Sequence, residues 1–212
     1  PKDILSLSIY KESIDARKRG EINFIYTVDI TVVDEHKFLT GKFKHVALTP
    51  ELAYQNPQKG DKQLTSRPVV VGFGPAGMYA ALLLAQMGYK PLVLERGEAV
   101  DERVKSIDAF WQKGKLNPKS NVQFGEGGAG TFSDGKLTSR VKDLRGRKVL
   151  TELVNAGAPE EILYKAHPHV GTDLLRDIVK NIRKEIIKLG GEVRFNTQVK
   201  QVNLAQQQLK SL

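Results

Sequence analysis

The clearest pattern of hydrophobic and polar positions lies between residues 68 and 97. A β-branched apolar run at 69–71 predicts a strand that is buried on both faces of a sheet. An Ala- and Leu-rich run over 78–87 predicts a helix, which Gly88 would end. A second apolar run at 91–94 predicts another strand. Together these elements predict a strand–helix–strand unit.

The turn after the first strand has the pattern Gly-x-Gly-x-x-Gly, formed by Gly72, Gly74 and Gly77. Such glycines permit a tight turn, close approach of a pyrophosphate, and close packing of helix on strand. Pro75 suits the first helical turn, because its missing N–H has no helical partner there. Glu95, about 20 residues further on, can accept hydrogen bonds from an adenosine ribose, and its charge disfavours the 2′-phosphate of NADP. The motif predicts a dinucleotide site, and a glycine-rich turn without a ligand is the alternative.

The rest of this half of the chain alternates between helical and extended patterns. The predicted elements are helices over 98–113, 147–156 and 174–189 and strands over 193–195 and 199–202. Trp111 falls on the apolar face of the first of these helices, so we expect it to pack in the core rather than stack on a flavin or base. Thr172 is expected to cap the last helix, with Asp173 in its first turn.

Residues 1 to about 55 predict a small separate α/β unit. Its expected elements are strands over 4–9, 22–33 and 37–47 and a short helix over 13–19. The polar stretch 56–63 contains both Pro57 and Gly60 and predicts a linker. We therefore expect a small α/β accessory domain over 1–62 and a Rossmann-like α/β domain with a parallel central sheet over 63–212.

A second glycine-rich stretch covers residues 121–140. Five glycines stand within eleven residues: Gly125, Gly127, Gly128, Gly130 and Gly135. Neither a packed helix nor a strand favours this density, because glycine loses the most backbone entropy on ordering. The interleaved Phe124, Phe132 and Leu137 indicate an anchored loop rather than a flexible one. We expect this loop to contact a cofactor.

Composition narrows the possible chemistry. The 212 residues contain no cysteine, which excludes disulfides, thiolate metal sites and a redox-active cysteine pair among them. No apolar run reaches the roughly 20 residues that span a bilayer, so a soluble, cytoplasmic protein without a membrane partner is expected. The net charge is +9, and residues 113–148 carry nine basic against three acidic side chains. This segment suits cofactor or substrate phosphates or a solvated lysine-rich face, and nucleic acid is a disfavoured partner.

No side chain stands out as a general acid or base, so the catalytic residues stay unassigned. His167 and His169 are the two that merit testing. Their spacing with Asp173 fits no standard zinc signature and no cysteine joins them, so no metal site is expected.

The order of these motifs resembles the FAD-binding half of the glutathione-reductase-like flavoproteins. More narrowly, FGEGGAGTFSDGKLTSR together with HPHVGTD is similar to a family of bacterial FAD-dependent dehydrogenases for which no substrate is assigned. The resemblance runs from about Ser13 to Val202. It implies an oxidoreductase that moves hydride through flavin N5 to or from a small molecule, with NAD(P)H as a possible co-substrate.

The resemblance also implies roles for individual residues. The implied FAD-binding residues are Gly72, Gly74, Pro75, Ala76, Gly77, Glu95, Arg96, Gly127, Gly128, Lys136 and Val199. The first glycine motif would hold the diphosphate, Glu95 the AMP ribose, and the second glycine loop the diphosphate–ribityl portion. Arg96 and the backbone of Val199 would lie beside the adenine. Lys136 would lie near the isoalloxazine, where a cation stabilises reduced flavin.

Two other functions stay open from the residues alone. The first is an NAD-binding dehydrogenase or sensor domain without flavin. The second is a basic module that binds nucleic acid or protein. The family to which the chain is similar continues well beyond Leu212, so we expect a fragment whose FAD-binding domain is incomplete at its C-terminus. The pattern gives no indication of the oligomeric state.

Overall fold

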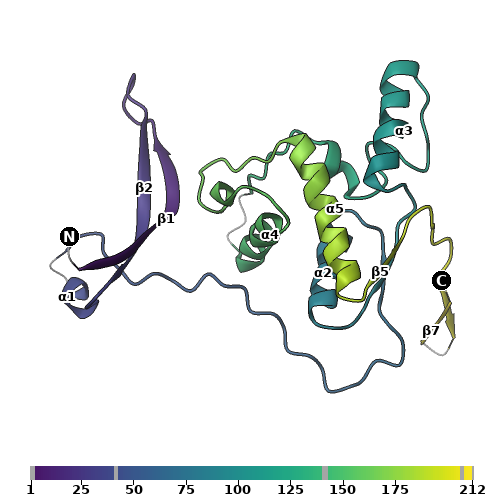
Figure 1. Cartoon of the computed structure of the whole chain (residues 1–212), viewed down its shortest axis with the longest axis horizontal. Coiled ribbons are helices and arrows are strands. Elements are labelled where there is room, and N and C mark those ends of the chain that lie inside the picture. The colour runs from purple at the N-terminus through teal and green to yellow at the C-terminus, as the bar shows by residue number, and fades with distance from the viewer. Residues whose placement is uncertain (1–2, 41–42, 140–142, 206–207, 212) are drawn as a thin grey trace. The chain divides into compact units, whose positions relative to one another are not determined.

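The computed structural model describes residues 3–40, 43–139, 143–205 and 208–211, which form two compact units (Figure 1). The first unit combines 1–55 with 136–154 and 159–169, and the second combines 56–135 with 155–158 and 170–212. The expected domain boundary between residues 62 and 63 stays a prediction. Each unit is described by itself.

Three short parallel strands form the sheet of the second unit. They are β3 (Val69–Val71), β4 (Leu92–Leu94) and β5 (Glu192–Arg194), in that order across the sheet. Val93 is fully buried in the central strand, where it pairs with Val70 and Val193. The predicted strand–helix–strand unit is confirmed, and the chain is a mixed α/β protein with a small parallel sheet.

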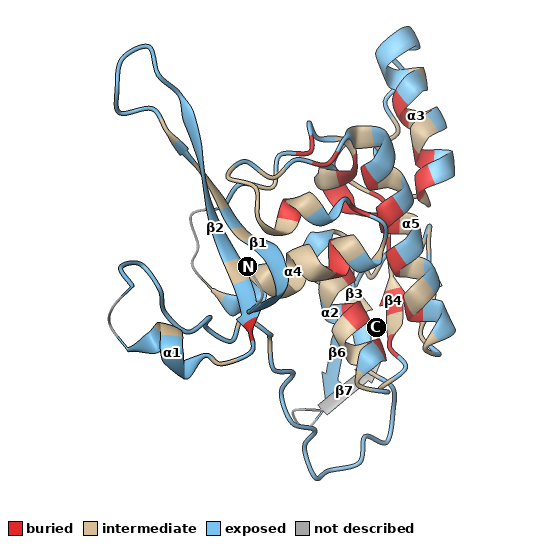
Figure 2. Ribbon diagram, turned by 60° about the vertical axis from the view of Figure 1, so that its left-hand side comes forward, coloured by how far each residue is buried: buried red, intermediate tan, exposed pale blue. Residues whose placement is uncertain are grey.

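Two helices supply most of the core beside this sheet (Figure 2). Helix α2 (Pro75–Gln86) contacts β3 and β4, helix α5 (Thr172–Lys188) contacts β5, and the two helices contact each other. Their buried residues recur at helical spacing: Met78, Ala81, Leu82 and Ala85 on α2, and Leu175, Ile178, Val179, Ile182 and Ile186 on α5. These buried residues form the apolar stripe by which each helix faces the core.

The sheet is not buried on both faces. Val70 faces α2, because its Cγ1 lies 3.4 Å from where a Cβ on Gly77 would stand. Val69 and Val71 point to the opposite face and are 36% and 60% exposed. The prediction of a strand buried on both faces is wrong within the described residues, since an apolar run alone does not tell how many faces are covered.

Helix α3 (Val100–Lys113) buries Val100, Arg103 and Ile107, which lie in its first two turns. Trp111 lies in its last turn and is 60% exposed. The prediction that Trp111 packs in the core is wrong, because the apolar stripe continues past the end of the surface on which the helix packs. Gly114 ends the helix in the left-handed conformation.

The other predicted boundaries in this unit shift by small amounts, except at the end of the chain. The range 199–202, predicted as a strand, has no regular structure. A hairpin follows instead, formed by β6 (Asn203–Ala205) and β7 (Gln208–Ser211). The bend at Asn196, which has a φ of +53°, turns the chain away from the direction of β5 before these strands begin.

The first unit is built on a long antiparallel ribbon. Its elements are β1 (Ile4–Asp15), β2 (Asn23–Val32), α1 (His36–Leu39), α4 (Leu144–Asn155) and the 3₁₀ turn η2 (Glu160–Leu163). The Glu12 N–H of β1 donates to the Tyr164 carbonyl at 2.8 Å, which ties the ribbon to the segment after η2. One ribbon face carries exposed apolar pairs such as Leu7 with Ile30 and Ile9 with Val28.

Two predictions for this unit are wrong. The expected helix over 13–19 is the end of β1 followed by a turn in which Gly20 has a φ of +88°. A seven-residue helix must meet the cost of nucleation with few hydrogen bonds, whereas strand pairing continues to Asp15. The expected strand over 37–47 contains the end of α1 and, over 43–47, no strand. Gly41, at which the sequence predicts a bulge or a turn within this strand, lies outside the described residues.

Close packing of α2 on β3 makes Gly77 a sensitive position for stability. A Cβ on Gly77 would stand 2.1 Å from the Gly72 carbonyl oxygen. We expect Gly77→Ala to lower the free energy of unfolding of the second unit by about 1–3 kcal/mol, because the backbone itself must shift. Urea unfolding monitored by circular dichroism measures this change.

Gly74→Ala is the matched control. Its Cβ would meet only the Gly128 Cα at 3.9 Å, and Gly74 has an ordinary φ of −74°. We expect it to cost less than about 1 kcal/mol, chiefly through its position before the helix. Equal unfolding curves for the two variants would contradict the packing argument.

Candidate functional site

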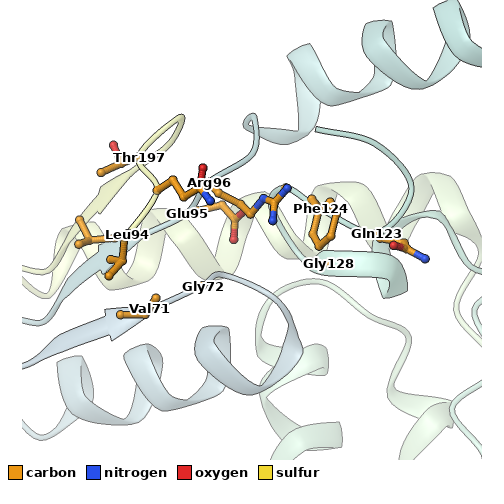
Figure 3. A pocket seen from close by; sticks show the side chains of 12 residues that line it. Val71, Gly72, Leu94, Glu95, Arg96, Gln123, Phe124, Gly128 and Thr197 are labelled. Atoms are coloured by element: carbon orange, nitrogen blue, oxygen red, sulfur yellow. The ribbon is translucent and has the colours of Figure 1, made fainter. Parts of the chain in front are cut away.

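The carboxyl ends of the parallel strands meet at one pocket of about 280 Å³ (Figure 3). Its lining comes from four segments of the second unit: Val71, Gly72, Leu94, Glu95, Arg96, Gln123, Phe124, Gly125, Gly128, Thr197, Gln198 and Val199. In open α/β sheets, ligands bind outside the carboxyl ends of the strands. The pocket brings together five of the eleven implied FAD-binding residues, namely Gly72, Glu95, Arg96, Gly128 and Val199.

The first glycine motif forms the turn from β3 into α2. Gly72 adopts a φ of +95°, which favours glycine, and its N–H donates to the Leu94 carbonyl at 2.8 Å. Pro75 is the first residue of α2, as predicted, with Ala76 after it. Gly74, Pro75, Ala76 and Gly77 do not line the pocket. They form the N-terminal end of α2, where N–H groups have no intrahelical partner.

Glu95 connects the end of β4 to this turn. Its side chain is buried at 4% exposure, and each carboxylate oxygen accepts a backbone N–H. Oε2 accepts from Phe73 at 2.7 Å, and Oε1 accepts from Gly97 at 2.8 Å. A carboxylate oxygen can accept more than one hydrogen bond, so these bonds leave capacity for a hydroxyl in the pocket. The ribose-binding role of Glu95 stays a prediction.

Arg96 and Phe124 form a flat wall of the pocket (Figure 3). The Arg96 guanidinium lies 3.8 Å from the Phe124 ring centroid, and its Nη2 donates to the Pro118 carbonyl at 2.9 Å. A cation stacked on an aromatic ring is attracted to the ring face. The pair fixes the Arg96 side chain at the pocket, and contact with an adenine remains a prediction.

The second glycine-rich loop lies directly against the first. The Gly127 N–H donates to the Phe73 carbonyl at 2.8 Å. A Cβ on Gly128 would stand 3.1 Å from both the Gly74 Cα and the Pro75 Cδ. Gly127 and Gly128 also adopt φ values of +76° and +61°, which side chains other than glycine disfavour. Residues 125–128 are buried, so the prediction of an anchored loop is confirmed.

A buried arginine binds the backbone carbonyls of this loop. Arg103 of α3 is 0% exposed, and its guanidinium donates to the carbonyls of Asn121, Val122 and Glu126 at 2.5–2.9 Å. Burial lowers the pKa of Arg103 to about 10, with Glu95 and Glu126 opposing the shift by Coulomb attraction. The guanidinium is therefore still charged at neutral pH, and three carbonyls share it.

Two contacts of the site have no signal in the sequence pattern. Gly97 makes one, because a Cβ there would stand 2.5 Å from the Gly125 Cα. Thr197 makes the other, since its N–H donates to the Glu95 carbonyl at 2.9 Å where the chain leaves β5 and reaches the pocket. Both contacts join segments that are distant in the chain, so only the fold reveals them. The high density of glycines in the second loop indicated Gly125, but it gave no indication of Gly97 as the residue that Gly125 contacts.

Lys136, His167 and His169 are also absent from the lining of the pocket. Lys136 pairs with His169 in an isolated antiparallel bridge of the first unit, and both side chains are exposed, as is that of His167. The described residues hold no group of three or more His, Asp or Glu side chains placed to bind a metal ion. The roles considered for Lys136 and the two histidines stay predictions.

The predicted cap of α5 is wrong in part. The helix begins at Thr172 itself, whose hydroxyl donates to the Ser133 carbonyl at 2.9 Å instead of capping the helix. Asp173 lies in the first turn, as expected. This hydroxyl ties α5 to the end of the second glycine loop.

Comparison with known proteins adds two findings. A family model described as a domain of unknown function (DUF8436) matches residues 1–31, which hold β1 and most of β2. A protein of Clostridium beijerinckii described as an uncharacterized protein is 50% identical over all 212 residues. The chain spans 40% of the length of that relative. Neither description names an activity.

No helix in the part of the chain that the structure describes is a candidate for crossing a membrane. Each helix there is too short or too polar to traverse a bilayer.

The two hydrogen bonds of Glu95 predict that its amide analogue will not replace it. In Glu95→Gln, the carboxamide NH₂ would face one of two backbone N–H donors, Phe73 or Gly97. We expect a loss of about 1–3 kcal/mol in the free energy of unfolding, because a buried donor loses its acceptor. Urea unfolding of the variant measures it.

Glu185→Gln serves as the control, since Glu185 is exposed and pairs with Lys188 on the surface of α5. Such pairs contribute only about 0–1 kcal/mol. If Glu95→Gln were as stable as Glu185→Gln, the bracing role of Glu95 would be refuted.

Proposed function

We propose that the second unit binds the ADP portion of FAD and that the chain is the FAD-binding part of a flavoprotein oxidoreductase. The observation that carries the proposal is the pocket at the carboxyl end of the sheet, where Gly72, Glu95 and Gly128 converge. A glycine turn and an acidic strand end at the carboxyl edge of a parallel sheet are features of dinucleotide recognition, and the second glycine loop meets them there.

The diphosphate would lie at the N-terminus of α2, beside the contact between the two glycine loops. Gly74 and Gly128 present bare Cα atoms there, and a Cβ on Gly74 would point toward the Gly128 Cα. Phosphate oxygens need backbone N–H donors at short range, and the N-terminus of α2 supplies them together with a favourable dipole. The bare backbone of both loops at this point fits a ligand that approaches the backbone itself.

The adenosine would occupy the pocket proper. Glu95 would accept hydrogen bonds from the ribose hydroxyls, and the Arg96–Phe124 wall would face the base. Val199 and Thr197 also line this pocket. A volume of about 280 Å³ is near the lower limit of about 300 Å³ for ligand pockets, which fits one nucleoside and not a whole dinucleotide.

The chemistry of such an enzyme would come from the flavin, which exchanges hydride at N5 when bound. The residues of this chain would bind and orient the cofactor. The cation that the resemblance places near the isoalloxazine would be Lys136. The substrate would be a small molecule, with nicotinamide as one possible electron donor.

NAD is the second candidate ligand, because the pocket would accept its adenosine as readily as that of FAD. FAD and NAD share the ADP portion, and the pocket has the size of a single nucleoside. The contact between Gly128 and the first glycine motif favours FAD, since it extends the backbone surface beyond the pocket.

The absorbance spectrum of the purified protein from 300 to 550 nm tests the proposal first. Bands near roughly 370 and 450 nm, with FAD released on heating, are expected for a bound flavin. Where the protein is isolated without cofactor, added FAD is expected to raise its thermal midpoint, since a ligand of the folded state stabilises it. Stabilisation by NADH and not by FAD would replace the flavin with NAD, and no effect of either would refute a dinucleotide site.

Gly74→Ala separates the diphosphate contact from stability. The added methyl group stands between the two glycine loops but meets no atom closer than 3.9 Å. We expect the Kd for FAD to rise at least about tenfold, or 1.4 kcal/mol, with little change in unfolding. Titration of the cofactor-free protein, followed by flavin fluorescence, measures the Kd.

Gly60→Ala is the control for this titration, because a Cβ on Gly60 would meet nothing within 4 Å. Its Kd is expected to equal that of the unmodified protein. Equal affinities for Gly74→Ala and Gly60→Ala would show that the diphosphate does not lie beside the contact between the glycine loops.

A further inference from the structure

Glu126, the acid inside the second glycine loop, is fully buried at 0% exposure. Its Oε2 accepts the N–H of Val100, the first residue of α3, at 2.8 Å. The same oxygen lies 3.2 Å from Nη1 of Arg183 on α5. One carboxylate therefore joins the loop to the N-terminal end of one helix and to the side chain of another.

The backbone of Glu126 is held as firmly as its side chain. Its N–H donates to the Glu98 carbonyl at 3.0 Å. Its carbonyl accepts from Nη1 of Arg103 at 2.5 Å and from the Thr131 hydroxyl at 2.9 Å. The next two residues, Gly127 and Gly128, are those that contact the first glycine motif. The position of Glu126 thus sets where these glycines stand.

The electrostatic surroundings of Glu126 make its charge conditional. Burial raises the pKa of its carboxyl, and Asp101 of α3 raises it further. The Val100 N–H, Arg183 and Lys180 oppose this shift, and Arg103 is a further nearby cation. Oε1 is buried without a hydrogen-bond partner among the described residues, so half of the carboxylate is uncompensated.

We infer that Glu126 is a positioning residue of the proposed dinucleotide site, whose ionised carboxylate holds the second glycine loop in the shape that meets the diphosphate. The inference rests on the proposed function. Protonation of Glu126 removes the ion pair with Arg183, and it leaves the Val100 N–H with a weaker acceptor. The loop then loses part of its connection to both helices, and Gly127 and Gly128 lose their fixed distance from Gly74.

The test compares FAD affinity of the unmodified chain and Glu126→Gln across pH. Above the raised pKa, Glu126→Gln is expected to bind FAD about tenfold more weakly, a loss of 1.4 kcal/mol. As the pH falls through that pKa, the unmodified chain becomes neutral at this position, and the two Kd values converge. Groups common to both proteins cancel in the ratio of Kd values. A purely structural role would give a ratio that does not change with pH.

Hydrogen–deuterium exchange of the cofactor-free proteins gives an independent readout. The amides of residues 124–128 are expected to exchange faster in Glu126→Gln, and those of α2 to stay unchanged. Glu185→Gln is the matched control, because it removes an exposed carboxylate from α5 and should alter neither exchange nor affinity. If Glu126→Gln does not fold, Arg183→Gln replaces it, since it removes the same ion pair from a partly exposed partner.

The outcomes are distinguishable. If the unmodified chain binds no FAD at any pH, the proposed function fails and takes this inference with it. If it binds FAD and Glu126→Gln binds equally well at every pH, the inference alone is overturned. A weaker but pH-independent affinity also overturns it, because the charge of the carboxylate would then have no part in holding the loop.

Discussion

The site at the edge of the sheet depends on backbones that approach more closely than side chains allow. A Cβ on Gly97 would stand 2.5 Å from the Gly125 Cα, and one on Gly128 would stand 3.1 Å from the Gly74 Cα. With Gly77 packed on Gly72, three separate glycine contacts converge on the ends of β3 and β4. A side chain at Gly97, Gly128 or Gly77 could not be accommodated by moving a neighbouring side chain, since a backbone atom stands in the way in each case. The glycines therefore determine how the loops meet, and the ligand pocket is the space that they leave.

Two buried carboxylates keep these backbones in place. Glu95 accepts the Phe73 and Gly97 amides and so joins the first glycine turn to the end of β4. Glu126 accepts the Val100 amide and pairs with Arg183, which joins the second loop to two helices. Glycine-rich segments have high conformational entropy when unfolded, so they need strong local bonds to become ordered. Charge-assisted hydrogen bonds to backbone N–H groups are about twice as strong as neutral ones, and they provide that order.

Much of this arrangement can be predicted from the sequence, for identifiable reasons. The strand–helix–strand unit has its apolar runs, its glycine spacing and its acidic strand end in one continuous stretch, so local pattern is sufficient. The anchored second loop is indicated by Phe124 and Phe132 among its glycines. Predictions failed where the length of an apolar stripe or the cost of a short helix decided the outcome. Trp111 extends past the packed part of α3, and residues 13–15 prolong a strand pair.

The remaining site residues are invisible in the sequence because their partners lie on distant segments. Glu126 and Glu95 both accept backbone amides while buried, and they differ in how their partners lie along the chain. Glu95 follows its motif at a spacing set by one helix and one strand, which any reader of the sequence can count. The partners of Glu126 are the start of α3 and a turn of α5, and their distance along the chain depends on the lengths of intervening loops. A buried carboxylate needs a cation or backbone amides as partners, because its burial otherwise costs free energy. For Glu126 the fold supplies both kinds of partner from distant segments.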